Sequence, residues 1–495
     1  MTPLKWLLTF LLLAVVARWG SFFPSVINHD ESTYIVIADE LLRGQVYLRD
    51  VVDTKPIGIF WLYALFLKLT GGSLFLLRVI AALVVGAGAF GLYLTGRRAF
   101  REERVGVAAG AIYVIITSVF RYYGVSPNTE IYFNGLTIAA VALAVAPRFR
   151  RGEADPFWHW PAAGLLLGLA MIIKPFAAAE ALAIGLFMLW YYWGRGSYGR
   201  GVAAGLALTG AFALPLLFVY GYYAQLGLLE ELAFYTFTVG AAYPVDLPWY
   251  LRLKYMADYV LLRCLPFVLL WVGALGLWAK KGARAQVQKK DVHSRVRRRW
   301  LRYFALQFLL VTVVVLLTGK RFGHYQVQLA PVIALLAATW WAPGLRSYAF
   351  LRGPRLRRFA PWLVGTVCLA LGFVHYFYYA GKADDPRTLA TYFADKLEPE
   401  ETVFLVNGWQ ITYHLLDRPV PTPYVHSSLL FLDHHVRAFR IDEEREARRI
   451  LEDERVRYLV TRKRDAELDG KLGRALLGAF APVDTVAGKF VVYRR

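Results

Sequence analysis

A polar segment with paired acids follows directly after the first apolar stretch of this chain. Within residues 28–56, the carboxylates of Asp30 and Glu31 are adjacent in sequence, and Asp53 and Lys55 stand near the end of the segment. Ionisable side chains beside a long apolar stretch are costly, so we treat them as functional candidates. A carboxylate placed there can accept the proton of a substrate hydroxyl, and a lysine can bind an anion.

Further cations occupy short turns between later apolar stretches. Lys174 lies directly before a proline in one turn, and Arg321, His324 and Tyr325 lie in or beside another. Lys55 has a simple alternative role, because a lysine at the end of an apolar helix can extend its ammonium to the membrane surface. Lys174 sits between two apolar stretches, where that role is harder to assign.

Two helix starts carry acids. Asn28 and Glu31 have the spacing of a capping box, which predicts a helix that begins with Asp30 and Glu31 in its first turn. Tyr34 then begins an apolar face on this short helix, which we expect to lie on the membrane surface. Glu130, close to Asn128, is either a first-turn acid or a second carboxylate of the site.

Composition indicates a membrane protein. The 495 residues are 57% hydrophobic, and the mean hydropathy is +0.41. The net charge of +21 is better explained by basic cytoplasmic loops than by nucleic-acid binding, which we do not expect. Both cysteines lie in apolar runs, so no disulfide framework is predicted. We expect the first apolar stretch to be an uncleaved span.

Hydropathy predicts eleven transmembrane helices within a membrane domain of residues 1–380. The stretch 57–70 is apolar but short, and we treat it as a second helix of the outer loop 24–73 rather than as a span. The predicted spans are 4–23, 74–95, 105–122, 128–146, 158–173, 176–193, 201–223, 259–279, 303–318, 325–343 and 361–380.

Charge decides the orientation. With 57–70 outside, every basic loop falls on one side, and these loops hold 24 of the 57 lysines and arginines. The positive-inside rule makes that side cytoplasmic and places Asp30 outside. The outer side then also holds three cations that the positive-inside rule disfavours there, Lys55, Lys174 and Arg321. We interpret them as ligands of an anion, most simply a phosphate at the membrane surface.

The composition changes after residue 380. Segment 381–495 is charged and contains three β-like runs, at 402–406, 457–460 and 490–493, with helical patterns between them. It is predicted to be a small α/β domain on the same outer side as Asp30.

Carboxylates and phosphate-binding cations at a membrane surface fit one reaction, the transfer of a sugar from a lipid-linked phosphate to a hydroxyl. A carboxylate takes the hydroxyl proton, and fixed cations stabilise the charge that grows on the departing phosphate. The phosphate is already a good leaving group, so no cofactor or metal is required, although a divalent cation is compatible with the site.

At these residues the chain resembles the GT-C-type glycosyltransferases that use polyprenyl-phosphate sugars. The resemblance is to the bacterial branch related to protein O-mannosyltransferases and to the transferase that adds aminoarabinose to lipid A. It covers about residues 1–345. It rests on Asp30-Glu31, Asp53-Thr54-Lys55-Pro56, the turn at Glu130, Lys174-Pro175, and Arg321-Phe322-Gly323-His324-Tyr325 leading into Leu329-Ala330-Pro331.

The resemblance implies that Asp30 is the general base of an inverting transfer. It implies donor-phosphate binding by Lys55, Lys174, and Arg321 or His324, and a juxtamembrane helix at 57–70. The chain departs from the family in having Glu130 where relatives often have Asp, and it lacks the β-trefoil domain of the eukaryotic enzymes. The full candidate set is catalytic Asp30 and Glu31; phosphate-binding Lys55, Lys174, Arg321, His324 and Tyr325; and substrate-binding Asp53, Glu130, Asn128 and Tyr34.

The expected partners are a polyprenyl-phosphate sugar, a lipid, glycan or protein acceptor, and the lipid bilayer. We expect a monomer in a bacterial cytoplasmic membrane. A flippase for a lipid-linked saccharide is an alternative, but flippases usually need polar groups along the path, and many contain repeats. A polysaccharide polymerase or ligase is another, since it shares this chemistry and takes an oligosaccharide donor. A non-catalytic assembly scaffold is a further alternative.

Overall fold

Two compact units make up the fold. The computed structural model describes residues 2–119, 124–145, 157–242, 247–258, 292–318, 322–339, 354–406, 409–426, 428–462 and 470–495. The helical unit comprises Met1–Phe22, Arg78–Phe218 and Val245–Tyr379, and the mixed unit comprises Phe23–Leu77, Val219–Pro244 and Ala380–Arg495. The third segment of the mixed unit begins at 380, where the composition changes. The outer loop 24–73 packs within this unit too.

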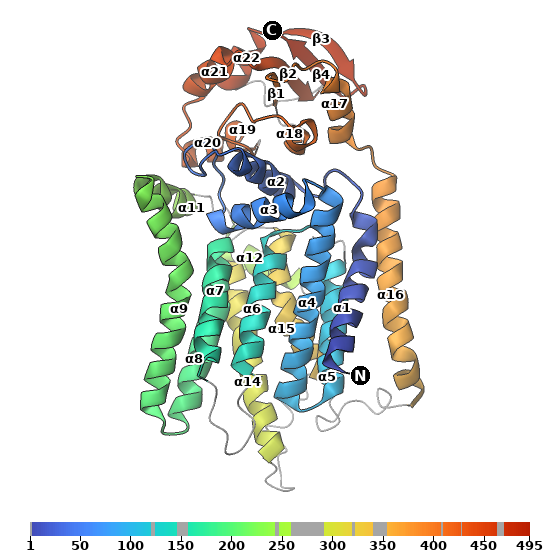
Figure 1. Cartoon of the computed structure of the whole chain (residues 1–495), viewed down its shortest axis with the longest axis vertical. Coiled ribbons are helices and arrows are strands. Elements are labelled where there is room, and N and C mark those ends of the chain that lie inside the picture. The colour runs from blue at the N-terminus through green and yellow to red at the C-terminus, as the bar shows by residue number, and fades with distance from the viewer. Residues whose placement is uncertain are drawn as a thin grey trace. The chain divides into compact units, whose positions relative to one another are not determined.

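The helical unit consists of long helices that run side by side (Figure 1). The elements that lie wholly or mainly in it are α1 (Pro3–Arg18), η1 (Trp19–Ser21), α4 (Leu74–Phe100), α5 (Glu103–Ser118), α6 (Thr129–Val145), α7 (His159–Ile173), η3 (Pro175–Ala177), α8 (Ala178–Trp193), α9 (Tyr198–Gln225), α12 (Trp249–Asp258), α14 (Val292–Leu317), η6 (Gly323–Leu329), α15 (Ala330–Ala338) and α16 (Pro354–Ala380).

Six of the described helices are long and apolar enough to cross a membrane, and each overlaps a predicted span. This chain is therefore a multi-pass membrane protein. Helices α6 and α7 are apolar but shorter. The predicted span 259–279 lies outside the described residues, so the total of eleven stays a prediction. The six long stretches are Pro3–Ser21, Leu74–Phe100, Pro175–Trp193, Tyr198–Gln225, Arg298–Leu317 and Arg358–Ala380.

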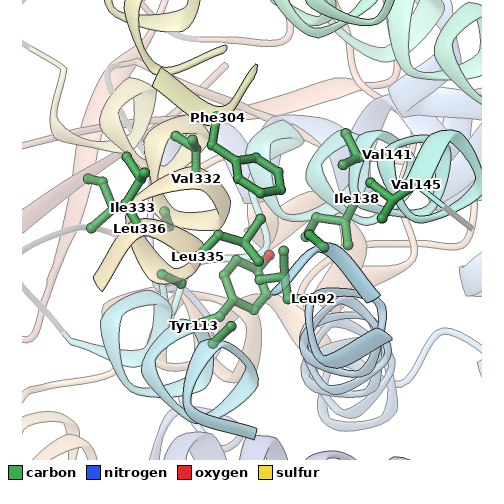
Figure 2. Close-up of a cluster of buried hydrophobic side chains, with 14 of the residues drawn as sticks. Leu92, Tyr113, Ile138, Val141, Val145, Phe304, Val332, Ile333, Leu335 and Leu336 are labelled. Carbon is green, nitrogen blue, oxygen red and sulfur yellow. The ribbon is translucent and has the colours of Figure 1, made fainter. Parts of the chain in front are cut away.

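The core of the helical unit is built from aliphatic and aromatic side chains. Side chains from α4, α5, α6, α14 and α15 meet there, including Leu92, Tyr113 and Phe304 (Figure 2). Helices α7 and α9 approach closely because α7 carries Gly164 and Gly168 one turn apart. A Cβ atom at these positions would lie 2.1 and 2.3 Å from backbone carbonyl oxygens of α9. Small residues with this spacing allow membrane helices to pack backbone to backbone.

The mixed unit combines two helices of the outer loop with a sheet and short helices. Its elements are α2 (His29–Leu42), α3 (Ile57–Thr70), α10 (Leu229–Ala233), the π-helical turn η4 (Phe234–Thr238), α11 (Val239–Ala242), α17 (Asp385–Ala394), β1 (Thr402–Leu405), α18 (Ile411–Leu416), α19 (Ser428–Phe431), α20 (Asp433–Ala438), α21 (Glu443–Glu452), β2 (Val456–Arg462), α22 (Lys471–Leu477), β3 (Ala481–Val486) and β4 (Phe490–Arg494).

The sheet has the strand order β1-β2-β4-β3. Strand β1 pairs parallel to β2, and the other two pairings are antiparallel. The three predicted β-like runs correspond to β1, β2 and β4. Sequence analysis missed β3, because only its last residue is buried and it lacks the apolar alternation of a half-buried strand. A three-residue turn, Ala487 to Lys489, joins β3 to β4, and its first two residues, Ala487 and Gly488, have positive φ.

Helix α2 is covered by protein on its polar side as well as its apolar side. Its apolar residues pack against α3, where Tyr34 makes edge contacts with the rings of Phe60 and Tyr63. Its polar residue Glu40 is also buried, and it accepts hydrogen bonds from Arg43 and from the backbone N–H of Val420. The C-terminal segment therefore covers the side of α2 that amphipathicity alone would assign to water.

His414 joins three elements of the mixed unit. Its Nδ1 lies 2.7 Å from the carboxylate of Asp39 on α2, and its Nε2 lies 2.9 Å from the carbonyl oxygen of Gly72 after α3. Both partners accept hydrogen bonds, so both ring nitrogens donate and the imidazole is charged. Burial lowers the pKa of His414 and Arg43 opposes the charge, but the hydrogen bond and charge of Asp39, with the Gly72 carbonyl, raise the pKa overall.

This contact predicts a stability that depends on pH. A raised folded-state pKa contributes stability that is fully present below the ordinary value of 6.5 and is lost as pH rises through the folded-state pKa. In thermal unfolding of the detergent-solubilised proteins, the wild type should therefore unfold at a higher temperature than His414→Gln at pH 6. This difference in unfolding temperature should shrink toward pH 8. His29 and His426, whose pKa values burial lowers, act in the opposite direction in both proteins and cancel in the comparison. An advantage that does not change with pH would contradict a charged His414.

Candidate active site

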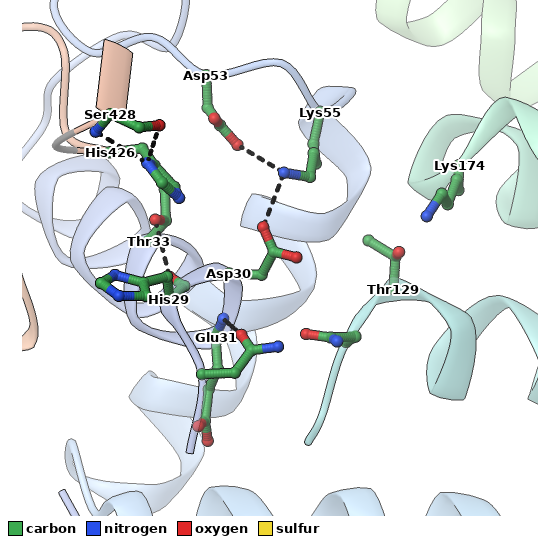
Figure 3. Close-up of polar contacts among 12 residues, drawn as sticks. His29, Asp30, Glu31, Thr33, Asp53, Lys55, Thr129, Lys174, His426 and Ser428 are labelled. Atoms are coloured by element: carbon green, nitrogen blue, oxygen red, sulfur yellow. Dashed lines mark hydrogen bonds and ion pairs between the residues drawn. The ribbon is translucent and has the colours of Figure 1, made fainter. Parts of the chain in front are cut away.

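Asp30, Asp53 and Lys55 form a cluster in the mixed unit, which we call the juxtamembrane cluster. The Lys55 ammonium lies 3.0 Å from Oδ1 of Asp30 and 3.6 Å from Oδ2 of Asp53, between the two carboxylates (Figure 3). Asp53 is almost fully buried, whereas the side chains of Asp30 and Lys55 are 17% and 20% exposed. Asp30 and Lys55 are thus the members that a substrate can reach.

Local structure places these side chains. The Asn28 side chain accepts a hydrogen bond from the backbone N–H of Glu31 at 3.1 Å and so begins α2 where the capping spacing predicts. Pro56 is the residue directly before α3, and its ring fixes the backbone angle φ at the helix start. The Tyr47 hydroxyl lies 2.9 Å from the carbonyl oxygen of Asp53 and 2.6 Å from that of Lys55.

Burial raises the pKa of Tyr47 well above its usual range, so this hydroxyl remains a donor. Because it bonds to the carbonyls on both sides of residue 54, it holds the turn that presents Lys55 toward Asp30. Without these hydrogen bonds, the short loop and the long lysine side chain could adopt several conformations. The ion pair is therefore positioned by the backbone as well as by charge.

The other two candidates in this unit have different roles. Glu31 is buried, and its carboxylate lies 3.4 Å from the backbone N–H of Ile27, which fits a helix-capping role. Tyr34 is buried with its ring 5.8 Å from the Lys55 ammonium. The structure thus brings Asp30, Asp53, Lys55 and Tyr34 together and directs Glu31 to the helix start.

A second cluster, which we call the bundle-end cluster, lies in the helical unit. Glu130 at the start of α6 forms an ion pair with Lys174 after α7, and both side chains are buried. The Lys174 ammonium also lies 4.0 Å from the ring centre of Tyr325 and 4.7 Å from that of Phe176. Aromatic faces stabilise a cation without neutralising it. Removing one partner of such a buried pair costs about 3–5 kcal/mol.

Buried polar side chains position the elements of this cluster. The guanidinium of Arg18, at the end of α1, donates to the carbonyl oxygens of Thr117, Gly124 and Val125, which fixes the turn before Glu130. Gln328 in η6 donates to the carbonyl oxygen of Phe176 and to Glu180. Gln328 thereby holds η6, which carries Tyr325, against the turn that carries Lys174.

The remaining candidates are less central to the bundle-end cluster. Asn128 accepts a hydrogen bond from the hydroxyl of Ser126, and its Nδ2 is buried without a hydrogen-bond partner among the described residues. The His324 ring packs edge-on against Tyr325, with ring centres 4.7 Å apart. Arg321 lies outside the described residues.

No group of three or more His, Cys, Asp or Glu side chains that could hold a metal ion occurs among the described residues. The juxtamembrane cluster offers two carboxylates, but an ammonium lies between them where a cation would bind.

Sequence reasoning missed several residues that hold the clusters. Arg18 was detectable, because an arginine at the end of an otherwise apolar first helix is costly unless it is bonded. Tyr47, Gln328 and Gln410 carry no such signal, since each is uncharged and acts on a backbone carbonyl. For Gln328 and Gln410 that carbonyl is also distant in sequence. Gln410 donates to the carbonyl oxygen of His29, directly before Asp30.

Comparisons with known proteins find similar sequences over part of the chain. Residues 54–220 match the family model of the dolichyl-phosphate-mannose-protein mannosyltransferases. An undecaprenyl phosphate-alpha-4-amino-4-deoxy-L-arabinose arabinosyl transferase of Pseudomonas fluorescens is 28% identical over 189 residues, which is 35% of this chain and 33% of that protein. The transferase of Pseudomonas aeruginosa is 27% identical over 205 residues, 39% of this chain and 36% of that protein. The chain thus spans about a third of the length of the curated relatives it matches.

Solved structures extend the likeness of the fold to nearly the whole chain. ArnT from Cupriavidus metallidurans bound to undecaprenyl phosphate has a TM-score of 0.65 and 16% identity, with 99% of this chain and 98% of that chain covered. The oligosaccharyltransferase of Archaeoglobus fulgidus tethered with an acceptor peptide has a TM-score of 0.54 and 14% identity, with 93% and 69% covered. The resemblance that the sequence predicts, to GT-C-type membrane glycosyltransferases of the protein-mannosyltransferase and aminoarabinose-transferase branch, is therefore confirmed.

Proposed function

We propose that this chain is an inverting glycosyltransferase that moves a sugar from a polyprenyl phosphate to a hydroxyl of an acceptor, with Asp30 as the general base. The ion pair between Asp30 and Lys55 carries this proposal. It gives a carboxylate that is ionised, partly exposed and held on a capped helix start. The names of the matched relatives, which include undecaprenyl phosphate and arabinosyl transfer, support the choice of donor.

The proposed step is a single displacement. The acceptor hydroxyl oxygen attacks the anomeric carbon, the bond from that carbon to the phosphate oxygen breaks, and the hydroxyl proton passes to Asp30. The phosphate leaves with its electron pair as polyprenyl phosphate. Attack opposite to the leaving group inverts the anomeric configuration. A well-placed base contributes about 10²–10⁴-fold to such a step.

We assign donor-phosphate binding to Lys55, Lys174 and Tyr325, with Arg321 and His324 as further candidates. An ammonium 3.0 Å from Asp30 stabilises the carboxylate and so weakens it as a base. A phosphate that draws Lys55 away would restore that basicity, so Lys55 has a role both before and after the donor binds. Lys174 lies against the rings of Tyr325 and Phe176 and pairs with Glu130, so a phosphate would take the place of that carboxylate beside the ammonium. Asp53, Glu130, Asn128 and Tyr34 remain candidates for substrate contacts.

The proposal places the enzyme in a bacterial cytoplasmic membrane as a monomer. The excess of basic residues in the predicted cytoplasmic loops puts Asp30 and segment 381–495 on the outer side. The acceptor is a lipid, a glycan or a protein. No cofactor is part of this step, and adding or chelating divalent cations during the assay tests whether one assists it.

Replacement of the base tests the reaction. We expect Asp30→Asn to release polyprenyl phosphate about 10²–10⁴-fold more slowly than the wild type, because the amide cannot accept the proton. The assay supplies undecaprenyl-phosphate-linked 4-amino-4-deoxy-arabinose and a membrane lipid and glycan extract as acceptor. It measures free undecaprenyl phosphate by chromatography, which a flippase would not produce.

A matched control exists in the same loop. Asp50 is an aspartate paired with its neighbour Arg49 at 2.9 Å, and Asp50→Asn should keep the wild-type rate. Undiminished release by Asp30→Asn, with the Asp50→Asn protein equally active, would exclude Asp30 as the base.

Replacement of Lys174, the cation of the bundle-end cluster, tests binding of the donor phosphate. We expect the double variant Lys174→Met, Glu130→Gln to bind undecaprenyl phosphate about 10–100-fold more weakly, because a charge-assisted hydrogen bond contributes about 1.5–3 kcal/mol. Changing both partners avoids leaving a buried glutamate unpaired. The dissociation constant is measured on the purified protein in detergent.

Lys68 on α3 provides the control, since its side chain is exposed. Lys68→Met should bind undecaprenyl phosphate as the wild type does. Equal affinity in the double variant and in Lys68→Met would remove Lys174 from the phosphate site.

A further inference from the structure

The C-terminal part of the mixed unit contacts the helix turn that carries Asp30. Gln410 donates from Nε2 to the carbonyl oxygen of His29 at 3.1 Å and to the hydroxyl of Thr33 at 2.8 Å. The Trp409 ring stacks on His29, with ring centres 4.5 Å apart and an angle of 17° between planes. Residues almost 400 positions apart in sequence therefore share one small region.

His426 is a reactive side chain of this region that the proposed mechanism does not use. Its ring centre lies 5.9 Å from that of His29. The charges of Asp53, Lys55 and Asp30 all act on it, so it borders the juxtamembrane cluster. It is half-buried, and it comes from the loop that leads into α19.

Hydrogen bonds define which nitrogen of His426 carries the proton. Its Nδ1 lies 3.3 Å from the backbone nitrogen of Ser428 and 2.7 Å from the hydroxyl of that serine (Figure 3). A backbone N–H can only donate, so Nδ1 is the acceptor and the proton is on Nε2. Burial lowers the pKa of His426 to about 4, so the ring is neutral at physiological pH. Its Nε2–H makes no hydrogen bond to the residues that the structure describes.

The neutral Nε2–H of His426, close to the proposed base Asp30, is suited to donate a hydrogen bond to an uncharged oxygen. Lys55 is the cation of this cluster and is the better ligand for phosphate. In a single displacement the attacking hydroxyl must touch Asp30, so the groups that border Asp30 without being cations are placed to contact the acceptor. Orientation of that hydroxyl is worth a large part of the rate, because a misplaced nucleophile reacts slowly.

We propose that His426, supplied by the C-terminal segment, is an acceptor-binding residue whose Nε2–H donates a hydrogen bond to a neutral oxygen next to the attacking hydroxyl. Ser428 is a positioning residue that fixes the ring orientation. This inference rests on the function proposed above. It gives the C-terminal segment a direct part in acceptor selection, through a residue that is distant in sequence from the transferase motifs.

Two measurements on the full-length purified protein separate acceptor binding from donor binding. The first titrates the membrane lipid and glycan extract at saturating donor and records the concentration that gives half-maximal release of undecaprenyl phosphate. For His426→Phe we expect this concentration to rise about tenfold, the loss of one neutral hydrogen bond. His426→Gln, which retains an N–H donor near the Nε2 position, should stay within about threefold of the wild type. The second measures binding of undecaprenyl phosphate alone, which should be the same in all three proteins.

His414→Ala controls for loss of stability. It removes the contacts of His414 with Asp39 and Gly72 and so weakens the same unit without touching His426. This variant should unfold at a lower temperature and still require the wild-type extract concentration. A rise in the extract concentration that half-maximal release requires, seen in His426→Phe and reversed in His426→Gln, would therefore not be a general effect of unfolding.

The outcomes distinguish the two proposals. If His426→Phe titrates like the wild type, or loses undecaprenyl phosphate binding to the same degree as extract use, the acceptor role is overturned and the transferase proposal stands. If His414→Ala raises the extract requirement as much as His426→Phe does, the effect is structural and the acceptor role is again overturned. If the wild-type protein releases no undecaprenyl phosphate, both proposals fall.

Discussion

The ammonium of Lys55 between two carboxylates is the interaction on which this account depends. At 3.0 Å from Asp30, it forms an ion pair with a partly exposed carboxylate. The surrounding structure serves this contact: Asn28 begins the helix, Pro56 ends the loop, and Tyr47 holds the turn. The position of Asp30 is thus set before a substrate arrives, and in the proposed mechanism it is Lys55 that moves when the donor phosphate binds.

The mixed unit explains why a membrane protein carries so much polar structure around one short loop. The C-terminal segment buries the polar side of α2, so Glu40 and Asp39 must be satisfied by Arg43, Val420 and His414. Each such group would be costly if left unpaired. The free-energy cost of burying these polar groups has a purpose if the segment fixes the first turn of α2, which carries Asp30, and supplies His426 to the same region.

Sequence reasoning found the charged side chains of the two clusters and the helix cap Asn28, and it missed Arg18, Tyr47, Gln328 and Gln410, which position them. Asp30, Lys55, Glu130 and Lys174 could be named because ionisable groups beside apolar stretches are rare and therefore informative. The pairing of Glu130 with Lys174 could not be predicted, since it depends on how α6 and α7 pack. The burial of Glu40 was equally hidden, because helical periodicity reports one apolar face and not what covers the other. Edge strand β3 escaped for a related reason, as only its last residue is buried.

The central claim is that Asp30 accepts a proton in a single displacement and forms no bond to the sugar. The anomeric configuration of the product tests this most directly, because a carboxylate acting as nucleophile would give two displacements and retention. Nuclear magnetic resonance of the glycosylated product, compared with the polyprenyl-phosphate donor of known configuration, reports the outcome. The account predicts inversion at the anomeric carbon, and a product with retained configuration would contradict it.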